Sequence, residues 1–187
     1  MWSVGIVADR LQALTIRVTS PDANLQGRLN GRDVRIQFRP DTYRDYDEPK
    51  LAHQLGRLLT LMSTGYRRGH GEIMKEAKLI SVTDPKDAGN EAQRRYLEGV
   101  AQLAVVGKTS RGLVRIRSIG MRNWECRIAD ETVANLAESA FIAETEASIQ
   151  TLLSNYRREI VFLKDRCYGL DIPAVRRERL AAERANG

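Results

Sequence analysis

The sequence predicts an α+β fold built from two similar units, each with a helix, a three-stranded antiparallel sheet and a long helix. Short stretches of alternating apolar and polar residues precede long stretches with apolar residues three and four positions apart, which is typical of strands followed by a helix. This order occurs twice. Equivalent positions lie 90 residues apart, as in Val34 and Trp124, Ile36 and Cys126, Phe38 and Ile128, Thr42 and Thr132, and Tyr66 and Tyr156.

The repeat depends on pattern, because few letters are identical between the two copies. Two unrelated strand–helix units that align by chance would give the same pattern, and at this stage that alternative stays open. We interpret the chain as a duplicated module. Its units are residues 1–83 and 84–172, and residues 173–187 form a basic C-terminal tail.

Three strands are predicted in the first unit. Apolar and polar side chains alternate at residues 14–19, 25–29 and 34–38. Turn-forming residues at 20–24 separate the first two stretches. Asn30-Gly31, between the second and third, is the strongest short hairpin signal. An antiparallel sheet in chain order follows.

Helices are predicted on both sides of this sheet. Residues 2–12 indicate a short helix or an irregular lead-in. Asp47 followed by Pro49 indicates the cap and first turn of a long helix. Three glycines within 65–71 each cost about 1 kcal/mol relative to alanine in a helix. We therefore expect this helix to loosen there, and to bend or fray before Ala77.

The second unit is predicted to repeat this order. Asp84-Pro85 indicates the start of a helix that runs to about Leu103. Strands are expected at residues 103–109, 113–119 and 123–128. A closing helix is expected to start near Asp130 or Thr132 and to end at Tyr168-Gly169, and Pro173 prevents its simple continuation. The tail beyond Pro173 is expected to be helical only where it has a partner.

Length and composition indicate an ordinary folded chain. The protein has 187 residues, of which 42% are hydrophobic and 29% are charged. A chain of this size and composition can form a stable hydrophobic core without disulfide bonds or bound metal ions. No run approaches the roughly 18 apolar residues of a membrane span. The first ten residues lack the basic and apolar segments of a signal peptide. We expect a cytoplasmic protein without membrane association.

The cysteines and the net charge indicate which kinds of binding partner to expect. Cys126 and Cys167 are far apart and belong to no CxxC motif, so we expect neither a disulfide nor a zinc site. The net charge of +6 and the pI of about 9.6 favour nucleic acid as a partner. Residues 1–90 and 91–187 each carry +3, so the positive charge does not come from one tail.

Several short motifs connect the chain to a known family. The second unit contains GKTSRGLVRI at 107–116, then Gly120 and a strand that ends in IAD at 128–130. The first contains TSPD at 19–22 and IQFRPDTYR at 36–44, which leads into DEPKLA at 47–52. With these motifs, the chain resembles the YbaB/EbfC family of bacterial nucleoid-associated proteins, and its first unit is similar to the actinobacterial form. Together the two matches cover most of the chain.

The resemblance implies a helix, a three-stranded sheet and a long helix in each unit. It also implies a small homodimer that binds DNA with little sequence preference. Two units in one chain would form an intramolecular pseudo-dimer, because a short tether gives an effective concentration in roughly the millimolar range. The first unit departs from the family in its short leading helix and in Gln26-Gly27, where the family prefers valine.

No motif of a known catalytic class occurs in the sequence. GxSxG, the P-loop, GxGxxG and HExxH are all absent, and His53 and His70 have no partner at a suggestive spacing. We therefore expect no enzyme, no catalytic residue, no metal and no cofactor. The expected function is that of a nucleoid-associated protein that binds the DNA phosphate backbone.

The candidate DNA-binding residues are all arginines. The triplets Tyr66-Arg67-Arg68 and Tyr156-Arg157-Arg158 occupy equivalent positions, and guanidinium groups bind phosphate oxygens in pairs. The alternative is that each tyrosine packs in the core while its arginines are solvated or pair with acids such as Glu72 and Glu159. The full candidate set is Arg67, Arg68, Arg94, Arg95, Arg115, Arg117, Arg157 and Arg158.

The polar positions of the strands suggest a basic sheet face as a second surface. It would include Arg115, Arg117 and Arg127 in one unit and Arg28, Arg35 and Arg39 in the other. In an alternative interpretation, neighbouring acids such as Asp33 and Glu125 neutralise the positive charge of this face.

Two other functions fit the same sequence. One is a protein-interaction module, for example an accessory factor of a type VII secretion system, that kept the fold without DNA binding. The other is a scaffold that forms homo-oligomers through open sheet edges.

Overall fold

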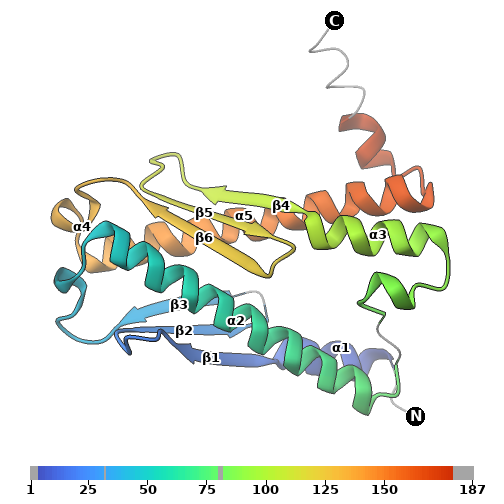
Figure 1. The fold of residues 1–187 in the computed structure, drawn as a ribbon, viewed down its shortest axis with the longest axis horizontal. Helices are drawn as coiled ribbons and strands as arrows, with labels where there is room; N and C mark the ends of the chain where they lie inside the picture. Colours follow the sequence, from blue (N-terminus) through green and yellow to red (C-terminus); the bar gives the residue numbers. More distant parts are fainter. Residues whose placement is uncertain (1–3, 32, 80–81, 179–187) are drawn as a thin grey trace, which may run out of the picture.

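A computed structural model describes residues 4–31, 33–79 and 82–178 (Figure 1). It confirms the α+β fold with two three-stranded antiparallel sheets, each flanked by helices in a repeated order. Part of the predicted lead-in and connector, and residues 179–187 of the predicted tail, lie outside the described residues. The first part comprises α1 (Val4–Ala13), β1 (Thr15–Thr19), β2 (Leu25–Asn30), β3 (Asp33–Phe38), a 3-10 turn (Tyr43–Asp45) and α2 (Glu48–Glu76).

The second part has the same order. It comprises a 3-10 turn (Pro85–Asp87), α3 (Glu91–Gln102), β4 (Ala104–Lys108), β5 (Val114–Ile119), β6 (Asn123–Ile128), α4 (Thr132–Asn135) and α5 (Glu138–Tyr168). Each middle strand, β2 or β5, pairs with both of its neighbours, so β1, β3, β4 and β6 are edge strands. Residues 173–178 form one more helical segment.

Backbone geometry repeats between the two parts. β2 begins at Leu25 and β5 89 residues later, whereas α2 begins at Glu48 and α5 90 residues later, because the β5–β6 turn has one residue more. Two left-handed positions recur with these spacings. Gly31 (φ 58°) corresponds to Gly120 (φ 57°), and Asp41 (φ 66°) corresponds to Glu131 (φ 61°). A non-glycine residue rarely adopts this conformation, so its recurrence supports a duplicated module.

Each long helix packs on the sheet of its own unit and also lies along an edge strand of the other unit. α2 packs on β1 and β2 and lies along β6 of the other unit, while α5 packs on β4 and β5 and lies along β3. In Figure 1, α2 passes in front of the first sheet and α5 passes behind the second. One layer therefore contains α2 beside β4–β6, and the other contains α5 beside β1–β3. The uncovered faces of the two sheets point in opposite directions.

The inner faces of both layers form one hydrophobic core. Val34, Ile36 and Phe38 are buried on the core side of β3, as the alternation predicts. The Phe38 ring lies 6.0 Å from the Phe141 ring of α5, and Tyr43 lies 5.5 Å from the same ring. Aromatic rings from both units therefore meet at the centre of a shared core.

Hydrogen bonds also join the two units where each long helix lies beside the other unit. Glu146 of α5 accepts a hydrogen bond from the Ile36 N–H of β3 at 2.9 Å. Glu48, in the first turn of α2, accepts one from the Val133 N–H at 3.0 Å. Arg44 donates to the carbonyl oxygen of Ala134 at 2.9 Å. These bonds satisfy backbone groups that neither unit satisfies by itself.

The predicted loosening of the first long helix is wrong, because α2 is continuous to Glu76. Of the three glycines within 65–71, Gly65 and Gly69 serve packing, whereas a Cβ atom on Gly71 would meet nothing within 4 Å. A Cβ atom on Gly65 would lie 2.8 Å from Ile16 Cγ2, and one on Gly69 would lie 2.8 Å from Leu14 Cδ1. Small residues at these two turns let β1 lie close to α2, and this contact compensates for the poor helix propensity of glycine.

Two predicted helix starts are also corrected. Asp84 caps only the 3-10 turn, and α3 begins at Glu91, where the Asn90 side chain accepts a hydrogen bond from Gln93 N–H at 2.8 Å. The closing helix is interrupted at Leu136, whose extended backbone turns its side chain onto the core, so the short α4 precedes α5. The predicted cap at Asp47 and the left-handed end at Gly169 are confirmed.

Candidate nucleic-acid interface and central cavity

The uncovered face of β4–β6 carries a row of cations. Lys108 of β4 is paired in register with Arg115 of β5, and Arg115 with Arg127 of β6. All three side chains are exposed. In the next register position along β5, Arg117 is opposite Glu125 at 3.8 Å, and Glu125 also binds Arg127 at 2.8 Å. Three strands therefore present four cations around one carboxylate.

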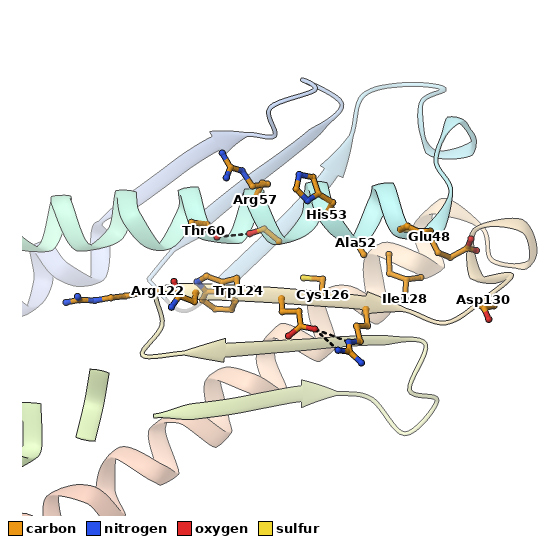
Figure 2. Close-up of a pocket in the computed structure, with 15 residues that line it drawn as sticks. Glu48, Ala52, His53, Arg57, Thr60, Arg122, Trp124, Cys126, Ile128 and Asp130 are labelled. Atoms are coloured by element: carbon orange, nitrogen blue, oxygen red, sulfur yellow. Dashed lines mark hydrogen bonds and ion pairs between the residues drawn. The ribbon is translucent and has the colours of Figure 1, made fainter. Parts of the chain in front are cut away.

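The same side of the molecule includes the outer surface of α2. An open groove runs between α2 and β6, and its lining includes His53 and Arg57. Figure 2 shows these two side chains projecting from the side of α2 away from β6, with Arg122 at one end of the groove. Glu48 and Asp130 lie at the other end (Figure 2). The basic face is defined by Arg57, Lys108, Arg115, Arg117, Arg122 and Arg127.

Cys126 lines this groove but is buried. Burial, with a smaller effect of Glu125, raises the pKa of the Cys126 thiol to about 12. The thiol is therefore protonated at neutral pH and is a weak nucleophile. Packing against the core explains its position on β6.

The opposite side of the molecule carries a second row, on β1–β3. Arg17 is paired in register with Arg28, and Arg28 with Arg35. Arg35 is held by Asp33 at 3.1 Å and by Glu146 at 3.0 Å. In α5, Glu146 and Ala147 stand where α2 has Gly56 and Arg57. The groove beside β3 therefore lacks the cations of the groove beside β6, and the two sides are not electrostatically equivalent.

The structure separates the eight arginines of the candidate set into different surroundings. Arg115 and Arg117 lie on the basic face. Arg94 and Arg95 lie on α3, where Glu91 pairs with both. Arg68 and Arg158 are exposed on the long helices, and Arg158 bonds the neighbouring Glu159 at 3.3 Å, as the alternative interpretation anticipated.

Arg67 and Arg157 both line a cavity between the two units. The cavity measures about 420 Å³, and α2, α3, α5 and the turns of both hairpins contribute to its lining. Its buried residues are apolar: Val34, Leu59 and Met62. Tyr66 and Tyr156 line it together with Arg67 and Arg157, so both predicted triplets converge on a single site.

Sequence reasoning did not select Arg57, Lys108 and Arg122. Lys108 could have been found from strand alternation, since it directly follows the buried Gly107 and therefore shares the polar face with Arg115. Arg57 and Arg122 come from different units, and they line one groove because α2 lies along β6 of the other unit.

Within the described ranges, no group of three or more His, Cys, Asp or Glu side chains is placed to hold a metal ion. Among the helices in those ranges, none combines the length and apolar character needed to cross a membrane. Comparisons with protein-family models, with curated proteins and with solved structures find no match to this chain.

Proposed function

We propose that this protein binds double-stranded DNA with little sequence preference, through the phosphate backbone and the basic face. The observation that carries the proposal is the row Lys108, Arg115 and Arg127 on adjacent strands. Like charges directly opposite one another destabilise a sheet. Arg127 is paired with Glu125, whereas the described residues offer Lys108 and Arg115 no carboxylate at ion-pair distance, so bound phosphates would offset the repulsion between these two cations.

The geometry of the face favours phosphates over bases. Reading bases requires an element that enters a DNA groove, commonly a helix or a two-stranded ribbon. Here most of the cations belong to a three-stranded sheet face and to the flank of α2, and Arg122 belongs to the β5–β6 turn. Contacts from such a surface would position the duplex without selecting a sequence. The resemblance to the YbaB/EbfC family supports the same function, which would place the protein at the nucleoid in the cytoplasm.

Removing two cations from the row is expected to weaken binding to every sequence alike. We expect the Arg115→Gln/Arg127→Gln variant to reduce the slope of log K against log salt by about 2, since each phosphate contact contributes about 0.9. Fluorescence anisotropy with a labelled duplex, titrated between about 50 and 200 mM salt, measures this slope. A second duplex of shuffled sequence is expected to give the same affinity.

The Arg94→Gln/Arg95→Gln variant is the matched control. It removes the same net charge from α3, where both arginines are paired with Glu91. Its salt slope is expected to equal that of the wild type. Absence of DNA binding at about 50 mM salt would contradict the proposal. If the protein does not bind DNA, and a pull-down after nuclease treatment recovers a stoichiometric protein partner, the protein-interaction module would be favoured instead.

A further inference from the structure

The central cavity combines an apolar interior with a cationic opening. Val34, Leu59 and Met62 are buried in its lining, and Leu97 and Val100 of α3 close it on another side. Leu29, Met121, Trp124 and Leu153 add further apolar surface. A cavity of 420 Å³ has room for about 14 water molecules, but its apolar walls offer few hydrogen-bond partners to them.

The exposed part of the lining is positively charged. Among the described residues, the exposed charged residues of its lining are Arg67, Arg122 and Arg157, and none is an aspartate or glutamate. An adjoining groove along α2 shares Tyr66 and Arg67 with the cavity and adds Arg68 and Lys75, and the residues that the structure describes in its lining include no carboxylate. The opening therefore has several cations and no acid to neutralise them.

Arg67 and Arg157 are equivalent residues of the two units, and each is held only by its own helix. Arg67 donates to the Thr64 hydroxyl at 3.2 Å. Arg157 donates to the Leu153 carbonyl oxygen at 3.1 Å and to the Ser154 hydroxyl at 3.3 Å. Within the part of the chain that the structure describes, neither has a carboxylate at ion-pair distance. Both guanidinium groups retain N–H donors for an anion.

Two tyrosines add hydroxyl groups to the lining. Tyr66 and Tyr156 are both half-buried in the lining. Burial, with a smaller contribution from Tyr96, raises the pKa of Tyr156, so its hydroxyl is a hydrogen-bond donor at neutral pH. In the lining, the arginines are exposed, the tyrosines are half-buried and Val34, Leu59 and Met62 are buried, so polarity decreases with burial.

We propose that this cavity binds an amphipathic organic anion, with its apolar body among Val34, Leu59, Met62 and Val100 and its acidic group between Arg67 and Arg157. The volume lies in the range of small-molecule sites, and such sites pair apolar walls with a few placed polar groups. A medium-chain carboxylate or the corresponding phosphate monoester has this chemistry. The cavity is distinct from the row of cations on β4–β6, so the inference does not depend on DNA binding.

The test uses a fluorescent aromatic anion, 1-anilinonaphthalene-8-sulfonate, bound to the folded full-length chain. Decanoate is expected to displace this probe at a concentration at least ~10-fold lower than decanol, because only the carboxylate gains charge-assisted hydrogen bonds. Decyl phosphate distinguishes the two acidic groups. Inorganic phosphate is expected to leave the probe bound, since it has no apolar body.

Two variants locate the binding site. Arg67→Gln/Arg157→Gln is expected to remove the preference for decanoate over decanol, whereas Arg68→Gln/Arg158→Gln, one residue further along each helix, retains it. Val100→Trp is expected to fill the cavity and to abolish displaceable probe binding, with cooperative thermal unfolding as the check that it folds. Equal displacement by decanoate and decanol in the wild type, or displacement by inorganic phosphate, would overturn the proposal. Unchanged probe binding in a folded Val100→Trp variant would overturn it as well.

Discussion

Gly107→Ala is expected to destabilise the protein by more than about 3 kcal/mol, beyond the usual cost of overpacking a core. A Cβ atom at Gly107 would lie 2.0 Å from the Ser148 carbonyl oxygen and 2.6 Å from the Leu152 backbone nitrogen. Both atoms belong to the backbone of α5, so relief requires β4 and the helix to move apart. Urea denaturation followed by circular dichroism measures the loss as a lower midpoint.

Gly27→Ala is the matched control in the other sheet. Gly27 also faces a long helix from within a strand, but its Cβ would meet Met62 Cε at 2.5 Å. Cε is the far end of a flexible side chain that can change rotamer, so we expect a loss of about 1 kcal/mol or less. Equal midpoints for the two alanine variants would show that β4 does not approach α5 as closely as described.

The close contact of Gly107 with α5 could not be predicted from the sequence. The motif around it supported the family resemblance and a strand, yet nothing local indicates which backbone lies against it. The strands themselves followed from alternation, because a sheet with one covered face imposes a period of two. Gly65 and Gly69 were misinterpreted for the same reason as Gly107, since helix propensity is local and their contacts with β1 are not.

The candidate site was predictable only in part. Arg115 and Arg117 were identified because strand polarity is visible in the sequence. The convergence of Arg67 with Arg157 was not, although their equivalence was. A repeat identifies equivalent residues, but whether they face each other depends on how the units pack. Here α2 and α5 bring them to one cavity because each helix lies against both units.

Phe141→Ala is expected to cost about 3–5 kcal/mol and to weaken both units together. Phe141 is 1% exposed, and its ring contacts Phe38 and Tyr43 of the first unit. The cavity would open at the centre of the shared core, not within one half. Hydrogen exchange measured by mass spectrometry is expected to show equal losses of protection in peptides from β1–β3 and β4–β6.

Phe141→Leu provides the control, because it retains most of the buried volume and is expected to cost less than Phe141→Ala. The two variants should differ in magnitude but not in distribution, since one core unfolds as one cooperative unit. If Phe141→Ala increased exchange only in α5 and β4–β6, the two units would be separate domains that merely touch. In that case Glu146 and Glu48, which bond backbone groups of the opposite unit, would be surface contacts and not part of the fold's stability.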